Sequence, residues 1–311
     1  MKINILQNPH PVPRREFLTT VAAAIGATSL AMLPGQSDAM PMNYSGQAPN
    51  LTVQQVIDLI QAEVPGAPFK DTVDTIKSGD ATQQVTGIVT TMFATVEVIK
   101  QAAALKANFI IAHEPTFYNH RDDTAWLEHD PVYQYKRDLL QQHKIVVWRC
   151  HDYIHNFKQD GVLMGVLTKL GWQNYYNATN PAMIVIPATT VGSLVAHAKK
   201  SLGIRQIRMV GDIKQSCSRI ALMPGASGGR SHIQLLQTEK PHVLMCGEVQ
   251  EWETSEYMRD ARAMGMPMSL IVLGHVASEE PGMEWLVPWL QPKVTGINVT
   301  HLASQNPFTE V

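Results

Sequence analysis

The chain has only three cysteines among its 311 residues, at Cys150, Cys217 and Cys246. This odd number, without metal-ligand spacing, argues against a disulfide framework, although a single pair in an oxidising compartment stays open. Cys150 and Cys246 also lie in apolar runs, where cysteine usually acts as a small hydrophobic residue. The sequence therefore predicts a fold that depends on its hydrophobic core.

The chain also lacks an excess of positive charge. The chain has 25 lysines and arginines against 27 aspartates and glutamates, which gives a formal net charge of −2. It therefore has no basic field that would attract phosphate backbones, and we expect no nucleic-acid partner. Convincing internal repeats and low-complexity tracts are also lacking.

The sequence has no apolar run long enough to span a bilayer, which takes about 20 residues. The run Thr19 to Leu33 is shorter, follows Arg14 and Arg15, and precedes the small residues of Ser37-Asp38-Ala39. This pattern predicts a twin-arginine export signal over residues 1–39, cleaved after Ala39. The mature protein is then periplasmic or otherwise exported, with no membrane attachment. An uncleaved membrane anchor is the alternative.

After a polar leader over residues 40–50, which we predict to be flexible, short apolar strands alternate with helical patterns. The helix that begins at Thr52 has a capping box with Gln55, and buried-type strands are predicted at Asn108–Ala112, Ile145–Cys150 and Met268–Leu273. This alternation predicts an α/β fold of two sandwich halves, residues 51–177 and 178–311, with mixed, largely parallel sheets.

Histidines and carboxylates follow three of these strands. They are His113 with Glu114, His151 with His155, and His275 with Glu279. Side chains at the carboxyl ends of strands converge on the crevice where ligands bind, and imidazole with carboxylate is a typical ligand set for divalent transition metals. The sequence therefore predicts a two-metal site in the crevice between the halves.

Each pair also has a plainer interpretation. In the first pair, the alternative is that His113 bonds to a loop backbone while Glu114 is solvated. His151 and His155 share a face only if their segment is helical, and otherwise one of them need not point inward. Asp152 suits an outer partner that fixes the tautomer of an imidazole. In the third segment, Ser278 can cap a helix that starts near Glu280, so that capping and solvent charge are the alternative there.

At these residues the chain resembles the Nif-three-like dinuclear-metal family, whose members are named as homologues of a type 2 GTP cyclohydrolase. The run Gly274-His275-Val276-Ala277-Ser278-Glu279 matches a family motif directly, and His113 with Pro115 matches parts of another. Further similarities are Cys246-Gly247-Glu248, the glycine-rich turn Gly225–Gly229 and the ending Asn306-Pro307-Phe308. The resemblance implies a homo-oligomer, a hexamer in the family, and two divalent ions.

Two departures from the family pattern concern the ligands. Glu114 stands where the family has a second histidine, and His155 stands where it has an aspartate. The ligand set that the resemblance implies is therefore His113, Glu114, His155, His275 and Glu279, which keeps three histidines and two carboxylates. Because this exchange preserves charge and donor types, we expect metal binding to persist, with iron, zinc or manganese as candidates. The family's early Trp-Asp-Asn pattern is not evident around Asp71–Asp80.

Two function classes follow from this site. Paired ions about 3.5–4 Å apart generate hydroxide from a shared water near neutral pH, which favours a metal-dependent hydrolase of an unidentified small substrate. Glu248 is then the candidate general base, or an ordinary helix-start glutamate. The turn Gly225–Gly229 either cradles an anion or is a plain turn, and Trp252 either lines a pocket or packs in the core. The second class is a non-catalytic metal-binding, storage or scaffold protein.

Overall fold

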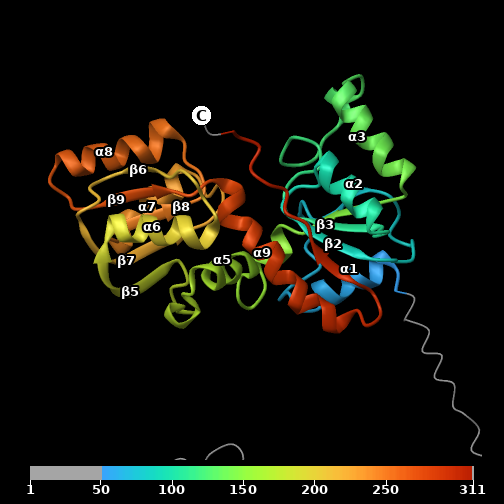
Figure 1. Cartoon of the computed structure of the whole chain (residues 1–311), viewed down its shortest axis with the longest axis horizontal. Coiled ribbons are helices and arrows are strands. Elements are labelled where there is room, and N and C mark those ends of the chain that lie inside the picture. The colour runs from blue at the N-terminus through green and yellow to red at the C-terminus, as the bar shows by residue number, and fades with distance from the viewer. Residues whose placement is uncertain (1–50, 310–311) are drawn as a thin grey trace, which may run out of the picture. The chain divides into compact units, whose positions relative to one another are not determined.

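The computed structural model describes residues 51–309 (Figure 1). The predicted signal peptide, the leader and the alternative of a membrane anchor all lie outside the described residues. Between residues 51 and 309, no helix combines the length and apolarity that crossing a membrane requires.

Two five-stranded sheets form the framework. The first has the order β1-β4-β3-β2-β10, in which β2, β3, β4 and β10 are parallel and β1 is antiparallel to β4. Its strands are β1 Ile76–Ser78, β2 Ile88–Thr91, β3 Phe109–Ala112, β4 Val146–Arg149 and β10 Val299–His301. The second sheet has the order β5-β7-β8-β9-β6, with antiparallel strands at both edges. Its strands are β5 Met183–Thr190, β6 Arg208–Val210, β7 Ser216–Met223, β8 Val243–Cys246 and β9 Ser269–Val272. The predicted α/β fold with mixed, largely parallel sheets is confirmed.

Helices connect and cover the strands. They are α1 Val53–Gln61, α2 Val96–Ala104, α3 Pro131–Gln142, α4 Asp152–His155, α5 Gly161–Leu170, α6 Val191–Leu202, α7 Gly229–Glu239, α8 Glu256–Ala263 and α9 His275–Leu290. Short 3-10 or π turns are η1 Ala125–Leu127, η2 Gln173–Tyr175, η3 Glu251–Ser255 and η4 Gln291–Lys293. The predicted capping box between Thr52 and Gln55 is present at the start of α1.

Each sheet has a buried core on both faces. On one face of the first sheet, Phe109 and Trp148 pack with residues of α1 and α9, and on the other face Ile110 and Val147 pack with residues of α2 and α3. The second sheet is covered in the same way, by α5 and α6 on one face and by α7 and α8 on the other. Because the parallel central strands are buried on both faces, they are almost continuously apolar, as predicted.

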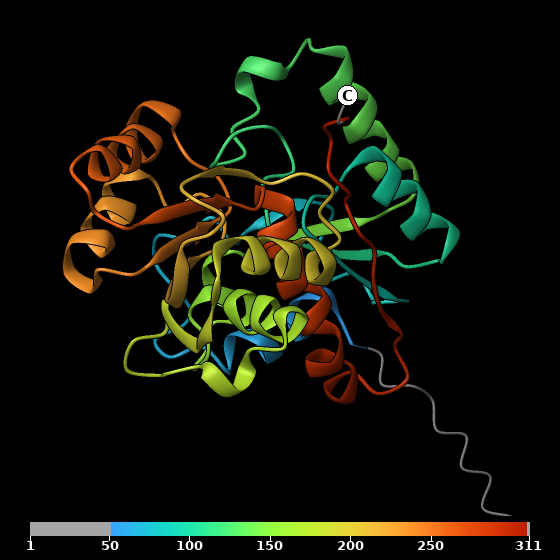
Figure 2. The same cartoon turned by 60° about the vertical axis from the view of Figure 1, so that its left-hand side comes forward.

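The sheets do not follow the predicted division of the chain strictly. Strand β10, from the C-terminal half, joins the first sheet beside β2, and α9 contributes Met283, Leu286 and Leu290 to the first core. Helix α9 also packs closely on α5, because Gly165 lies against the backbone of Pro281, where a Cβ atom would overlap it (Figures 1 and 2). The boundary at residues 177 and 178 stays a prediction.

Candidate metal centre

His113 and Glu114 leave the carboxyl end of β3, where both side chains are buried. The Nδ1 atom of His113 lies 3.2 Å from the carbonyl oxygen of Cys150, which only accepts hydrogen bonds, so Nδ1 carries the proton. In the neutral ring the other nitrogen, Nε2, then carries the lone pair. It is buried without a hydrogen-bond partner and lies 3.4 Å from the Oε2 atom of Glu279.

His151 is the N-cap of the single helical turn α4 and His155 is its last residue, so their segment is helical and their rings come together, with centroids 5.1 Å apart. Buried Asp74 fixes this turn, because its carboxylate accepts hydrogen bonds from the backbone N–H groups of residues 151–153. Asp152 accepts a hydrogen bond at 3.0 Å from Nδ1 of His151. Asp152 therefore lies beside the imidazole, and its role as an outer partner of a ligand stays a prediction.

His275 and Glu279 lie in the first turn of α9, which begins at His275 after Gly274 (φ 93°). The prediction that this helix starts near Glu280, with Ser278 as its cap, was wrong. Ser278 is inside the helix, where its hydroxyl donates to the carbonyl of His275 and accepts from the N–H of Gly225. The early start places His275 and Glu279 one turn apart on the same face, with Nε2 and Oε2 2.8 Å from each other.

Glu279 connects the three segments. Its Oε2 atom lies near Nε2 of both His113 and His275, and its Oε1 atom lies 4.0 Å from Nε2 of His155. One donor atom each of His113, Glu114 and Glu279 fall within 4.8 Å of one another, and the same holds for His113, His151 and His155. The residues predicted as ligands thus come together, in groups that could hold a metal ion, and His151 lies among them.

The charges of these groups are strongly coupled. Burial lowers the pKa of His275, but its hydrogen bonds to Glu114 and Glu279 and the charges of these carboxylates outweigh burial and raise it to about 10. Burial alone would raise the pKa of Glu279, yet the neighbouring imidazoles of His113 and His275 hold it below the ordinary value. Burial and the neighbouring charge of His113 lower the pKa of His151 to about 4. A proton on His275 therefore balances the paired carboxylates.

Glu248 lies at the rim of this cluster. It follows β8, is exposed, and places its Oε2 atom 3.5 Å from Nδ1 of His275. The turn Gly225–Gly229 offers fewer free N–H groups than an anion site needs, because those of Gly225 and Gly229 already donate to Ser278 and Glu253. This favours the plain turn. Trp252 is 74% exposed, so the core-packing interpretation was wrong.

Sequence reasoning missed three residues that support the cluster. Arg149 is fully buried and bonds to Glu114, Asp160 accepts a hydrogen bond from Nδ1 of His155, and Asp74 holds the backbone of α4. An arginine inside the apolar run Ile145–Cys150 was a visible signal, because an unpaired charge there is costly. Asp74 lies about 80 residues from its partners, and no spacing rule links them.

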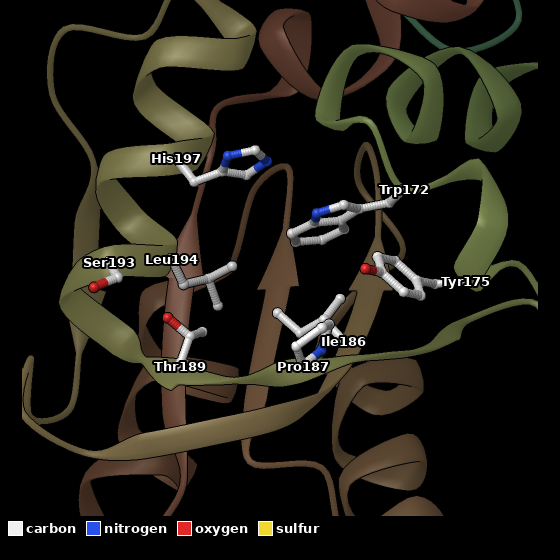
Figure 3. Close-up of a pocket in the computed structure, with 8 residues that line it drawn as sticks. All are labelled: Trp172, Tyr175, Ile186, Pro187, Thr189, Ser193, Leu194 and His197. Atoms are coloured by element: carbon white, nitrogen blue, oxygen red, sulfur yellow. The ribbon is translucent and has the colours of Figure 1, made fainter. Parts of the chain in front are cut away.

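A hollow of about 230 Å³ lies against the core of the second sheet (Figure 3). In it the ring of Trp172 stacks on that of His197, with centroids 5.6 Å apart and planes 13° from parallel. Nε2 of His197 already lies 2.9 Å from the carbonyl oxygen of Leu170. None of the residues that line this hollow is a candidate ligand, and these contacts account for His197 as a packing residue.

The sequence and the fold match a known family of proteins. A family model described as Duf34/NIF3 (NGG1p interacting factor 3) matches residues 51–307, and the chain therefore belongs to this family. Among curated proteins, it is 21% identical over 242 residues to a GTP cyclohydrolase 1 type 2 homolog of Clostridium perfringens, covering 74% of this chain and 88% of that protein. The homolog of the same name in Clostridium acetobutylicum is 22% identical over 272 residues, 83% of this chain and 97% of that protein.

Solved structures agree on the fold. A Bacillus cereus protein related to NIF3 superposes with a TM-score of 0.69 at 16% sequence identity, covering 84% of this chain and all of that one. A Staphylococcus aureus hypothetical protein gives a TM-score of 0.66 at 20% identity, covering 84% of this chain and 99% of that one. The family model over residues 51–307 confirms the predicted family, and these structures support the fold.

Proposed function

We propose that the protein binds two divalent metal ions at this cluster and uses them to hydrolyse a small substrate. The observation that carries the proposal is the convergence on Glu279 of histidines from three separate segments, His113, His155 and His275. Imidazole and carboxylate donors in this combination suit iron, zinc or manganese.

The chemistry of the donors supports a cation. His113 directs a buried nitrogen without a hydrogen-bond partner toward the carboxylate of Glu279, and when the ring is neutral two lone pairs face each other there. That arrangement is repulsive unless a positive charge lies between or beside them. In the metal-free protein the proton on His275 supplies part of this charge. A bound ion would supply it directly, as metal sites do when they displace protons from their ligands.

The two oxygens of Glu279 suggest how the donors would divide. Oε2 faces His113 and His275, whereas Oε1 faces His155, so Glu279 would serve both ions. Glu114 would join His275 on one side. His151, which the ligand set implied by the resemblance leaves out, would join His155 on the other, with Asp152 and Asp160 accepting from the Nδ1 atoms. Such second partners fix the tautomer and orientation of ligating imidazoles.

When bound, divalent ions act as Lewis acids and lower the pKa of water, which suits hydrolysis. Within the chain, Glu248 is placed to accept a proton, because its carboxylate is exposed and 3.5 Å from His275. We assign Glu248 as the general base. His113 and Glu279 are almost inaccessible to solvent, so a substrate would approach from the side of His275 and Glu248, which are more exposed.

The test uses the metal-loaded protein with small amides, cyclic amides and phosphoesters. Turnover that depends on the ion and falls about 100-fold or more in Glu248→Gln, with metal content unchanged, supports the hydrolase. Glu251→Gln, on a neighbouring exposed carboxylate, is the control. Metal binding without turnover of any of these substrates would favour the alternative, a non-catalytic metal-binding, storage or scaffold protein.

We also propose export by the twin-arginine route, on the basis of Arg14, Arg15 and the apolar run that follows them. That pathway carries folded proteins, so the metal would be loaded inside the cell before export. Assembly into a homo-oligomer, a hexamer, is proposed from the family resemblance alone.

A further inference from the structure

Arg149 is the last residue of β4 and pairs in register with Ala112 of β3, directly before the two candidate ligands that end that strand. Its side chain is fully buried. The guanidinium group donates from Nε to the carbonyl of His113 at 3.1 Å, from Nη1 to the carbonyl of His120, and from Nη2 to Oε2 of Glu114 at 3.0 Å. Every nitrogen of this group therefore has a partner on the segment that follows β3.

Because of this contact, the two carboxylate oxygens of Glu114 have different partners. Oε2 is bound to Arg149, whereas Oε1 lies 3.2 Å from Nε2 of His275 and 4.0 Å from Nε2 of His151. A free carboxylate can rotate and offer either oxygen, or both, to an ion. Here a rigid, planar partner that is itself anchored to two carbonyl groups removes that freedom.

We propose that Arg149 is a positioning residue that holds Glu114 as a one-oxygen metal ligand, with only Oε1 available to an ion beside His275. The inference rests on the proposed metal binding. It gives the buried arginine a role that the fold alone does not require, since the neighbouring positions of β4 are filled by apolar side chains. A lone carboxylate at this place would otherwise be buried without a fixed orientation.

The charges around Arg149 are consistent with this role. The only carboxylates within 4 Å of its guanidinium, among residues 51–309, are Glu114 and, at 3.9 Å, Asp122. Asp122 also lies 3.2 Å from Nζ of Lys77, which balances its charge. Glu114 is thus the main ionic partner of Arg149.

The experiment is a mutant cycle on the full chain, read as the affinity for Mn²⁺ in competition with a chromophoric chelator. Arg149→Met and Arg149→Lys are each combined with Glu114 or with Glu114→His. An imidazole at residue 114 offers a single donor nitrogen and has no second oxygen for the arginine to hold. Circular dichroism of each variant establishes that it is folded, and Arg149→Lys serves if Arg149→Met is not.

If Arg149 positions Glu114, its replacement lowers Mn²⁺ affinity about 10- to 100-fold beside Glu114. In the Glu114→His background the same replacement changes the affinity less than about threefold. An unchanged or tighter affinity beside Glu114, or an equal loss in both backgrounds, would overturn the inference while leaving metal binding intact. If the wild-type chain binds no divalent cation, the proposed function and this inference fall together.

Discussion

The Nε2 atom of His275 lies 2.8 Å from the Oε2 atom of Glu279, its neighbour one turn further along α9. This contact exists because the helix begins at His275 itself, directly after the positive-φ Gly274. A helix that began at Glu280 would leave both residues in irregular chain. The start of α9 at His275 therefore brings the donor atoms of His275 and Glu279 together.

The carboxylate of Glu279 occupies the space where a side chain at residue 225 would begin. A Cβ atom at residue 225 would overlap the Oε1 atom of Glu279, so Gly225→Ala should push this carboxylate aside and lower the affinity for divalent ions at least about 10-fold. Gly171→Ala is the matched control, because Gly171 has nearly the same φ (68° against 67°) and nothing near its missing Cβ. Both variants should lose about 1–2 kcal/mol of stability from the left-handed backbone. Equal metal affinities in the two variants would contradict this account.

The stability of the metal-free protein should fall at alkaline pH. Burial opposes protonation of His275, but Glu114 and Glu279 raise its pKa from 6.5 to about 10. The proton therefore stabilises the folded state fully below about pH 6.5, and that contribution is lost as the pH rises towards 10. On the acid side, the lowered pKa values of both glutamates give stability that is lost as the pH falls below their ordinary value of 4.5.

Urea unfolding in EDTA between pH 6 and pH 10 measures the alkaline effect. His275→Gln should flatten the decline, whereas His143→Gln, at an exposed histidine of α3, should not. Saturating metal should also flatten it, since an ion replaces the proton. A wild-type profile in EDTA that is level from pH 6 to pH 10 would show that the proton on His275 contributes nothing.

The three cysteines should be inert in the folded protein. All are buried and free, and burial raises the pKa of each thiol, that of Cys246 to about 12 with a further contribution from the charge of Glu248. Because only the thiolate reacts, Ellman's reagent at pH 8 should label none within minutes in buffer and three in guanidinium. Rapid native labelling of one equivalent would mean that a thiol is accessible.

Export can be tested on the twin-arginine pair. Replacement of Arg14 and Arg15 by lysine should keep the protein in the cytoplasm with its N-terminal segment uncleaved, while the wild-type protein is recovered outside with Met40 as its first residue. Lys2→Arg changes a basic residue away from the pair and should be exported normally. Cell fractionation and N-terminal sequencing decide the question. Equal export of the double-lysine variant would rule out the route.

Much of the fold could be predicted because its central strands are short, apolar and separated by capped helices. The runs at Asn108–Ala112 and Ile145–Cys150 contain β3 and β4, and Thr52 marks the start of α1. Strand β10 lies near the end of the chain, and its return to the first sheet beside β2 could not be foreseen. Periodicity reports which face of an element is buried, not which sheet it joins.

The residues that meet in the candidate site could be selected from the sequence, but the residues that support them could not. His113, Glu114, His155, His275 and Glu279 stand out because they follow strands, where side chains converge. The helix start at His275 was missed because Ser278 and Pro281 suggest a later cap, whereas the hydroxyl of Ser278 is taken by backbone groups at His275 and Gly225. Arg149 was passed over within an apolar run. Its role depends on Glu114, which follows the neighbouring strand β3 and is brought beside Arg149 only by the pairing of β3 with β4.

The most direct test of the central claim is the metal content of the purified mature protein, measured by elemental analysis after loading with iron, zinc or manganese. We predict two equivalents per chain in the wild type and a clear loss in His275→Ala and Glu279→Gln, with Glu128→Gln, at an exposed glutamate, as the control. Less than about half an equivalent in the supplemented wild-type protein, or equal content in all four proteins, would contradict the account.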